Sequence, residues 1–360
     1  MAKGYPRKWK TDKFKREAPA PLKFGADGKF KILHLTDIHD VEPIMDDDEN
    51  REIPINKDKE TINVIETLVA QTNPDLVVFG GDNVSGYWEE FTYDYVKSTI
   101  ERITAPIRER NIPLCVCFGN HDGEVGFHTE FQMLMYMEYP NCRSNLNDED
   151  VYGCGNCCVT IKDSKGEKDA FAIWLMDSND YERKVDGENF GYDHVHDDQI
   201  AWYESRSAQL REANGGEPLP AILFQHIPVQ QELDGFREVT DDGEYSFTER
   251  DGRRFYIENK ICEGRIREVP CPPNMEKDYT NQLESWKRMG DIFAAFFGHD
   301  HVNDFRMNVE GIDLYQTLGA GYFTYGLERG GRLIVLDENN PRKLYTESLQ
   351  VERITDTKFN

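Results

Sequence analysis

The sequence predicts an α/β fold in which helices cover the outside of a layered sheet core. Six short apolar runs, rich in β-branched and aromatic residues, alternate with longer segments of helical periodicity. Alternating strands and helices of this kind pack in layers with the helices outside. With 360 residues, 38% of them hydrophobic and 12% aromatic, the chain is long and apolar enough to bury a core, so a disordered protein is excluded.

The six apolar runs are expected to be buried strands. They are KFKILHLTD, PDLVVFGGD, IPLCVCFGN, DAFAIWLMDS, PAILFQHIP and DIFAAFFGHD. Helices are expected at Asp58–Gln71, Thr92–Arg110 and Asp198–Ala213, where the periodicity is helical and Asp or Thr stands at plausible N-cap positions. Each apolar run ends at a polar cluster, and loops at the carboxyl ends of strands converge on one crevice in α/β sheets. We therefore expect the polar clusters to meet in space.

The domain boundaries follow from breaks in this pattern. Residues 1–28 mix Lys, Arg, Pro and Gly without apolar periodicity and are expected to form an extended N-terminal arm. At about 150 residues per domain, the length is compatible with one large domain or with two. We expect a single domain over residues 29–350 and a C-terminal tail over 351–360. A charged segment at 232–280 interrupts the alternation, and a loop bordering the site and a remote surface excursion are equally compatible with it.

The charge of the chain limits its partners. Lys and Arg number 42 against 67 Asp and Glu, which gives a net charge of −25. This disfavours a broad basic surface, so neither nucleic acid nor a membrane is expected as a partner. An acidic protein that handles an anionic substrate must supply positive charge locally, and bound metal cations are one means of doing so. The chain contains no long apolar run and no signal-peptide pattern, so a cytoplasmic location is expected. The sequence does not determine the oligomeric state.

The eight cysteines are interpreted as free thiols, because a cytoplasmic protein is kept in a reducing environment. Cys154, Cys157 and Cys158 have metal-like spacing, but no second pair of Cys or His ligands accompanies them. We interpret them as small apolar residues at the start of a strand.

Five polar blocks at the strand ends carry the functional signal. In chain order they are Asp37-Ile-His39, Gly81-Asp82, Gly119-Asn120-His121-Asp122, His226 and Gly298-His299-Asp300-His301. Each block alone is weak, because short Asp, Gly and His combinations arise often by chance. Their succession, however, resembles the signature of the calcineurin-like metallophosphoesterase superfamily from about Lys31 to Gly326. Asp and Asn oxygens with His nitrogens also suit Mn, Fe or Zn, and no cysteine lies in any block.

This resemblance implies a four-layer α/β/β/α sandwich with two mixed sheets and a hydrolase that uses two transition metal ions. The first ion would be held by Asp37, His39, Asp82 and His301, and the second by Asp82, Asn120, His226 and His299. Asp82 would bridge the two ions. Residues two apart on an extended segment face the same side, so His299 and His301 can serve adjacent ions.

The family's chemistry implies in-line attack on phosphorus by a hydroxide that bridges the metals. His121 is expected to protonate the leaving oxygen as the general acid, with Asp122 orienting its imidazole; a structural role for His121 is the alternative. The expected substrate is a phosphomonoester, on a small molecule or a phosphoprotein. A phosphodiesterase acting on nucleotides or glycerophosphodiesters is the alternative within this chemistry. A scaffold without turnover is the alternative from another class.

A finer resemblance is to the purple-acid-phosphatase-like, Dcr2-type branch. It is carried by Phe224-Gln-His-Ile-Pro228, Trp174-Leu-Met-Asp-Ser178, the segment from Gly298 to Phe305 and the Gly-rich Gly319–Gly326. Purple acid phosphatases carry a tyrosine ligand three residues after the bridging aspartate, where this chain has Ser85. We therefore expect no purple colour, and the metal identity stays open.

The remaining candidates have weaker signals. Asp177, Asn303 and Tyr322 are expected to contact substrate, with turn formation or loop packing as the alternative. Four histidines lie outside the five blocks. His34 and His128 are interpreted as packing or capping residues, and His194 and His196 as part of an N-cap loop rather than as metal ligands.

Overall fold

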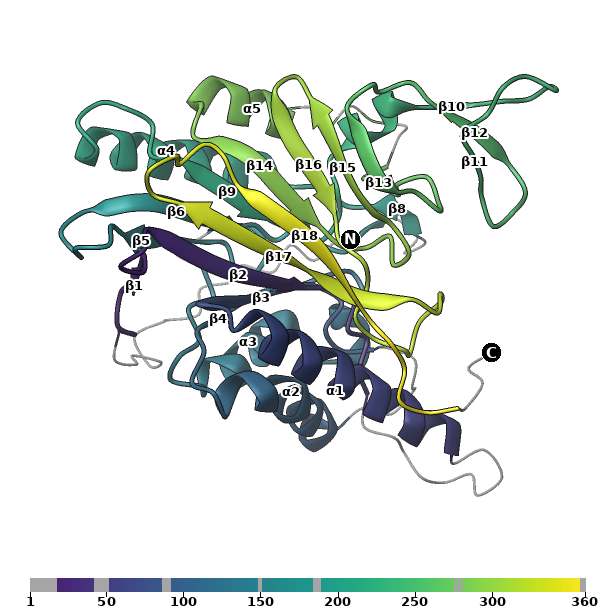
Figure 1. Cartoon of the computed structure of the whole chain (residues 1–360), viewed down its shortest axis with the longest axis horizontal. Coiled ribbons are helices and arrows are strands. Elements are labelled where there is room, and N and C mark those ends of the chain that lie inside the picture. The colour runs from purple at the N-terminus through teal and green to yellow at the C-terminus, as the bar shows by residue number, and fades with distance from the viewer. Residues whose placement is uncertain are drawn as a thin grey trace.

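Two β-sheets pack face to face at the centre of the molecule (Figure 1). The computed structural model describes residues 18–41, 52–85, 92–147, 151–183, 189–274, 277, 279 and 281–356. The larger sheet has the order β1 (Leu22–Lys23), β5 (Cys157–Lys162), β6 (Asp169–Leu175), β9 (Ala221–Phe224), β14 (Ile292–Phe297), β16 (Ile312–Gln316), β15 (Asp304–Val309) and β13 (Cys262–Arg265). The smaller has the order β18 (Tyr345–Val351), β17 (Arg329–Asp337), β2 (Lys29–Leu35), β3 (Leu76–Gly80) and β4 (Leu114–Cys117).

Both sheets are mixed. In the smaller sheet β2, β3 and β4 run parallel, while β17 is antiparallel to β2 and to β18. In the larger sheet β6, β9, β14 and β16 run parallel, and antiparallel strands lie on both sides of them. The six predicted strands are β2, β3, β4, β6, β9 and β14. Their parallel pairing brings the carboxyl ends of neighbouring strands to one edge of each sheet.

Helices cover the outer face of each sheet. The helices α1 (Glu52–Thr72), α2 (Tyr93–Arg108) and α3 (Thr129–Met137) pack on the smaller sheet, and α4 (Asp197–Ala213) and α5 (Asn281–Met289) pack on the larger one (Figure 1). The predicted four-layer α/β/β/α sandwich is therefore confirmed. Thr92 caps α2 as expected, because its side-chain oxygen accepts from the backbone N–H of Tyr95 at 3.3 Å. The first helix begins earlier than predicted, since Pro54 lies in its first turn, where proline is tolerated.

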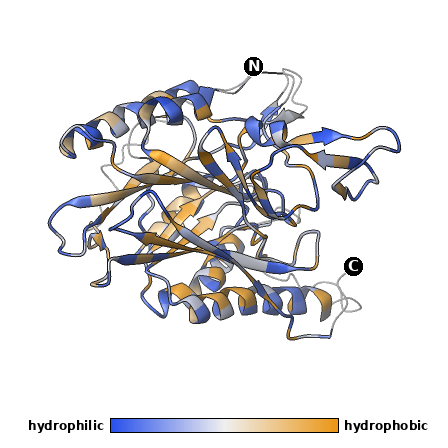
Figure 2. Cartoon of the chain, turned by 45° about the horizontal axis from the view of Figure 1, so that its top comes forward, coloured by the Kyte–Doolittle hydropathy of each residue, from blue (hydrophilic) through white to orange (hydrophobic). Residues whose placement is uncertain are grey.

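The apolar core between the sheets is built from the buried faces of the predicted strands. It includes Ile32, Val78, Phe171, Phe224 and Phe296. One further apolar cluster lies between each sheet and the helices that cover it. Figure 2 shows apolar residues concentrated on the central strands, while the outer helices present hydrophilic faces. His34 lies in this core with its ring 5.0 Å from Phe224, and burial lowers its pKa to about 3. Its interpretation as a packing residue is confirmed.

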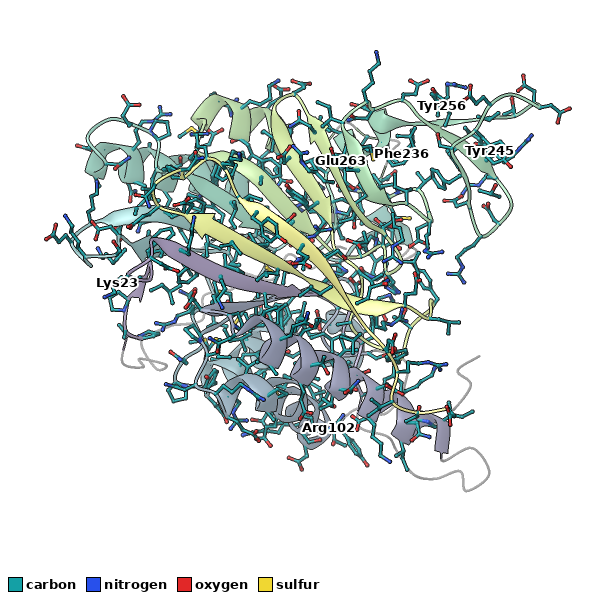
Figure 3. All side chains as sticks on the ribbon, viewed as in Figure 1. Lys23, Arg102, Phe236, Tyr245, Tyr256 and Glu263 are labelled. Atoms are coloured by element: carbon teal, nitrogen blue, oxygen red, sulfur yellow. The ribbon has the colours of Figure 1, made fainter. Side chains whose placement is uncertain are left out.

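The charged segment at 232–280 has two parts. After a 3-10 turn at Gln230–Gly235, β10 (Phe236–Glu238), β11 (Phe247–Thr248) and β12 (Arg254–Ile257) form a separate small sheet. This sheet projects from the sandwich, and Figure 3 labels Tyr245 and Tyr256 on it. The returning chain contributes β13 to the larger sheet and then contacts Asn303, whose Oδ1 accepts from the backbone N–H of Arg267 at 2.9 Å. The segment thus projects from the sandwich at its tip, and its returning part borders the loop after β14.

The cysteines agree with the thiol interpretation. None of the eight, all of which lie within the described residues, forms a disulfide, and Cys157 begins β5. No helix within the described ranges combines the length and apolar character needed to cross a membrane.

Candidate dinuclear metal centre

The seven predicted metal ligands come from the ends of five strands in both sheets. Asp37 and His39 follow β2, Asp82 follows β3, Asn120 follows β4, His226 follows β9, and His299 and His301 follow β14. All seven are buried. The fold therefore gathers side chains that lie up to 264 positions apart in the sequence, as Asp37 and His301 do (301 − 37 = 264).

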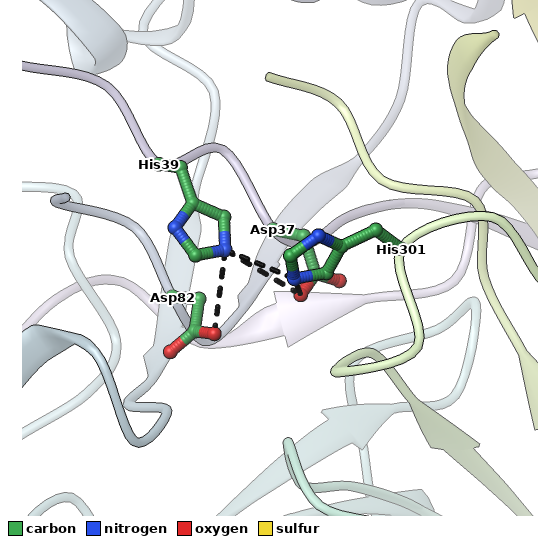
Figure 4. Close-up of side chains that lie close together, drawn as sticks. All are labelled: Asp37, His39, Asp82 and His301. Atoms are coloured by element: carbon green, nitrogen blue, oxygen red, sulfur yellow. Dashed lines mark hydrogen bonds and ion pairs between the residues drawn. The ribbon is translucent and has the colours of Figure 1, made fainter. Parts of the chain in front are cut away.

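The first group of donors consists of Asp37, His39, Asp82 and His301, whose ligand atoms all lie within 4.8 Å of one another (Figure 4). His39 Nε2 is 3.2 Å from His301 Nε2 and 3.4 Å from Asp82 Oδ2, and His301 Nε2 is 3.4 Å from Asp37 Oδ1. An ion with bonds of about 2.0–2.2 Å needs donors roughly 3.0–3.4 Å apart. The spacing fits one transition metal ion.

The second group shares Asp82 with the first. It consists of Asp82, His226 and His299, again within 4.8 Å of one another, and His226 Nε2 is 3.0 Å from Asp82 Oδ2. Asn120 adds an amide whose Nδ2 donates to the Tyr181 hydroxyl at 2.9 Å. Asp82 is thus the one carboxylate common to both groups of described residues, as a bridging ligand must be.

Unsatisfied polar atoms show that these residues fit metal ions. Asp82 Oδ2, Asn120 Oδ1, His226 Nε2 and His299 Nε2 are buried, and none makes a well-aligned hydrogen bond with the described part of the chain. Buried polar atoms are costly to leave without partners. Oxygen and imidazole nitrogen are the donors that Mn, Fe and Zn accept in proteins. Two ions at these positions would satisfy all four atoms.

Burial and mutual charge set the protonation of the ligands. Burial lowers the pKa of His299 to about 3 and also lowers that of His301, so both imidazoles are neutral, the form that binds metal. Burial also opposes a charge on His226, but the carboxylates of Asp82 and Asp37 outweigh it and raise the pKa of His226 to about 9. The same His226 charge outweighs burial at Asp82 and holds the pKa of that carboxyl well below its usual range. A cation is therefore favoured beside Asp82.

The backbone around the ligands is unusual. Asp37, His39, Asp82 and His299 have φ values of 51°, 45°, 51° and 74°, in the left-handed region that non-glycine residues rarely adopt. Such conformations cluster at functional sites, where the surrounding structure enforces them. The loops after β2, β3 and β14 each contain such a kink at a predicted ligand, whereas Asn120 after β4 and His226 after β9 do not have a positive φ.

Two glycines of the motif are required by close approach. A Cβ on Gly119 would collide with Asp82 Oδ1, and a Cβ on Gly298 would collide with the Thr36 side chain. The glycines therefore leave room for the ligand loops to pack against one another.

His121 lies beside the centre but pairs with a residue that the sequence did not indicate. Its backbone N–H donates to Asp82 Oδ1 at 2.8 Å, and its Nδ1 lies 2.6 Å from Glu124 Oε2. Burial opposes its protonation, but the hydrogen bond that it donates to Glu124 and the charge of Asp82 raise the pKa of His121 to about 9. Tyr181 donates to the other oxygen of Glu124 at 2.9 Å, which links the pair to the ligand Asn120.

The orienting role expected for Asp122 is therefore wrong. Asp122 is buried, and its carboxylate accepts from the backbone N–H groups of Gly119, Asn83 and Val84 at 2.8, 2.9 and 3.0 Å. These bonds tie the loop after β4 to the loop after β3. Glu124 could have been noticed from its position three residues after His121, whereas Tyr181 carries no local signal.

The three expected substrate contacts are buried and make contacts within the chain. Asp177, Asn303 and Tyr322 are 7%, 0% and 2% exposed. Asp177 accepts from the backbone N–H of Cys154 at 2.7 Å, and Asn303 donates to the Glu268 carbonyl at 3.0 Å. Tyr322 packs under the Arg329 guanidinium, whose central carbon lies 5.1 Å from the centre of the Tyr322 ring. These contacts favour the turn and packing alternative, and substrate contact by the three residues stays a prediction.

Aromatic residues support two of the ligands from behind. Tyr325 stacks on His301 at 4.2 Å, and Tyr192 meets His299 edge to face at 4.3 Å. Thr324 Oγ1 lies 2.5 Å from His301 Nδ1, which leaves Nε2 to face the centre. Arg250 of the projecting segment lies over the Tyr325 ring at 4.3 Å. The insertion therefore reaches the rim of the site.

Comparisons with known proteins agree with this geometry. The family model of calcineurin-like phosphoesterases matches residues 30–303. The probable inactive purple acid phosphatase 14 of Arabidopsis thaliana is 32% identical over 325 residues, covering 85% of this chain and 74% of that protein. The phosphatase DCR2 of Saccharomyces cerevisiae is 25% identical, covering 78% of this chain and 45% of its own length. A dimetal phosphatase from Danio rerio has the same fold, with a TM-score of 0.52, 12% identity, and coverage of 90% of this chain and 99% of that one.

Proposed function

The chain belongs to the calcineurin-like phosphoesterase family of metal-dependent phosphoric ester hydrolases, and on that premise we propose that it hydrolyses phosphomonoesters at a dinuclear centre. One observation carries the proposal: two groups of buried oxygen and nitrogen donors share the single carboxylate of Asp82. A pair of ions about 3.5–4 Å apart needs such a shared ligand. Small-molecule and phosphoprotein monoesters are both proposed substrates.

The bound ions would supply a water of lowered pKa and positive charge opposite the phosphoryl oxygens. The chain's own residues supply position and a proton. His121 lies next to the first group of donors, its ring 5.1 Å from that of His39, and its side chain is 33% exposed. It can therefore reach a bound phosphoester from the solvent side. Glu124 fixes its Nδ1, so that Nε2 carries the proton offered to the leaving oxygen.

The local charge resolves the problem posed by the net charge of −25. Asp37 and Asp82 attract cations into a buried site, and the cations in turn attract a phosphate. The anionic substrate then needs no basic surface. Mn, Fe and Zn are all proposed occupants. Ser85, which stands where purple acid phosphatases have a tyrosine ligand, is buried in the loop after β3.

The test compares two substrates with the same leaving group. Protein purified without chelator, its metals identified by elemental analysis, is assayed with p-nitrophenyl phosphate and bis-p-nitrophenyl phosphate. We expect faster hydrolysis of the monoester. A preference for the diester would replace the proposal with a phosphodiesterase acting on nucleotides or glycerophosphodiesters.

A scaffold without turnover is the second candidate, because the Arabidopsis relative bears the name of a probable inactive phosphatase. Such a protein is expected to have lost a ligand or the proton donor. This chain keeps all seven predicted ligands and His121. Absence of hydrolysis of both substrates, in protein that holds two metal ions, would favour the scaffold.

A further inference from the structure

A third group of potential ligands lies outside the dinuclear centre, just before α4. It consists of Asp193, His194 and His196, whose ligand atoms all lie within 4.8 Å of one another. His194 Nδ1 is 2.9 Å from Asp193 Oδ1, and His196 Nε2 is 3.1 Å from Oδ1 and 3.0 Å from Oδ2. The sequence predicts that the two histidines belong to an N-cap loop. The structure adds a carboxylate that lies between both rings.

His196 is the N-cap residue of α4 and forms a capping box with Gln199, in which the His196 side chain accepts from the backbone N–H of Gln199. Gln199 Oε1 accepts from the backbone N–H of His196 at 2.8 Å, and Asp197 and Asp198 supply the acidic first turn. Both hydrogen-bond contacts of His196 Nε2 are to Asp193 rather than to the helix. Capping therefore accounts for the position of His196, but it does not account for the convergence of His194 Nδ1 and His196 Nε2 on the Asp193 carboxylate.

Aromatic stacking fixes both rings in this arrangement. His194 stacks on Tyr279 with centroids 3.6 Å apart and planes 10° apart, and His196 stacks on Tyr152 at 3.9 Å and 10°. Ligands held by their surroundings lose little freedom on binding an ion. The donor spacing of 2.9–3.1 Å is close to the 3.2–3.4 Å found in the first group of the dinuclear centre. Opening by a few tenths of an ångström would accommodate an ion.

The site is also accessible. The side chains of His194 and His196 are 23% and 29% exposed, while that of Asp193 is 9% exposed. Zinc sites with three protein ligands keep the fourth position for water or another small ligand. The exposed side of the two rings provides room for it.

We propose that Asp193, His194 and His196 form a third metal site, separate from the dinuclear centre, that binds a divalent transition ion such as zinc. Two imidazole nitrogens and one carboxylate oxygen suit zinc and its neighbours in the first transition row. Calcium and magnesium are disfavoured, because they require oxygen ligands.

An ion at this position would connect segments that border the dinuclear centre. Its ligands follow β8 (Asn189–Tyr192), which pairs with β7 (Tyr181–Arg183), and their rings stack on Tyr152 and Tyr279 from two other segments. Tyr192, one residue before Asp193, supports the ligand His299. The ion would therefore tie three segments together at one side of the catalytic rim.

The experiment measures zinc on protein whose dinuclear centre is already loaded. Wild type, His196→Gln and Asp193→Asn are incubated with zinc, separated from free metal by gel filtration and measured by elemental analysis. Both substitutions keep the size and polarity of the side chain while removing a good metal ligand. We expect the wild type to retain one zinc more per chain than either variant. Zinc should raise the thermal unfolding midpoint of the loaded wild type but not of the variants.

The matched control is Asp82→Ala, which alters the dinuclear centre and leaves the third group intact. It should still gain the additional zinc, so the outcome does not depend on the proposed phosphatase activity. Equal zinc content in wild type and both variants would overturn the proposal and leave a hydrogen-bonded clasp. Binding that needs millimolar zinc would likewise overturn it.

Discussion

Glu124, rather than the expected Asp122, contacts the imidazole of His121. Asp122 accepts three backbone N–H groups and fixes the ligand loops, whereas Glu124 binds the imidazole of His121. Burial, helped by the charge of Asp82, raises the pKa of Asp122 to about 7, while the bond to His121 outweighs burial and lowers the pKa of Glu124. The side chain that remains ionised is thus the one that orients the proton donor.

The role of His121 can be tested with substrates that differ in their leaving group. If His121 protonates the leaving oxygen, His121→Ala should retain both metals and lose roughly 10²–10⁴-fold in turnover. An alkyl phosphate should suffer more than p-nitrophenyl phosphate, because p-nitrophenolate leaves without help. Glu124→Gln should show a smaller loss with the same dependence on the leaving group.

Steady-state kinetics and elemental analysis of the two variants decide between the roles. Equal losses on both substrates would mean that His121 positions phosphate rather than donating a proton. Depleted metal in His121→Ala would make it a ligand.

Asp82 should be the ligand whose loss affects both ions. Asp82→Ala should abolish activity and lower the metal content of the centre from two equivalents toward one or none, since no other carboxylate belongs to both donor groups. Elemental analysis of the purified variant measures this. Two tightly held ions with normal turnover would refute the bridging assignment.

At the level of elements, the buried parallel strands were predictable and the antiparallel ones were not. Strands such as β3 and β9 are buried along their whole length, so they read as continuous apolar runs. In contrast, β15 and β18 alternate between buried and more exposed positions and contain charged residues. Gly330 and Gly331 stand at the start of β17, where a Cβ on Gly330 would collide with the Leu349 carbonyl of β18. The apolar run Leu333–Leu336 follows them in β17, whereas β15 and β18 contain no such run.

The candidate site was predictable to a similar extent. Its ligands were found because they end predicted strands in a recognisable order. Tyr181 was missed because its contact with Glu124 joins residues 57 positions apart. The predicted substrate contacts stay predictions, because buried polar side chains at strand ends are also needed to bond loop backbones, as Asn303 does.

The 3-10 turn after β9 carries a buried acid that should make stability depend on pH. Glu232 is 0% exposed, and burial raises its pKa to about 8, although Gln316 donates to its Oε2 at 2.9 Å. The folded state thus holds this proton more tightly than the unfolded state, where the pKa is about 4.3. The contribution of Glu232 is fully favourable below that value and declines as the pH rises toward 8.

Glu232→Gln should remove this dependence. Relative to wild type, the variant should gain on the order of 2 kcal/mol in free energy of unfolding at pH 8 and nothing near pH 4. Denaturant unfolding of both metal-loaded proteins across this range measures the difference. A gain that is the same at every pH would attribute it to packing instead of ionisation.

At the scale of the whole molecule, two sheets deliver carboxylates and imidazoles to one buried edge of a chain with a net charge of −25. Without cations, that edge buries charged groups and polar atoms without hydrogen-bond partners in a region of low dielectric, which opposes folding. The metal centre is therefore expected to contribute to stability as well as to catalysis.

Chelation tests both consequences at once. Exhaustive treatment with a chelator should abolish activity and lower the thermal unfolding midpoint, and a divalent transition metal should restore both. Reducing agents should change neither, because no cysteine belongs to the donor groups and burial raises the pKa of thiols such as Cys262, to about 12. The Asp82→Ala variant is the control, since its unfolding midpoint should respond less to the chelator than that of wild type. Full activity after complete removal of metal, or inactivation by mild thiol alkylation alone, would contradict a catalytic metal centre built from these seven ligands.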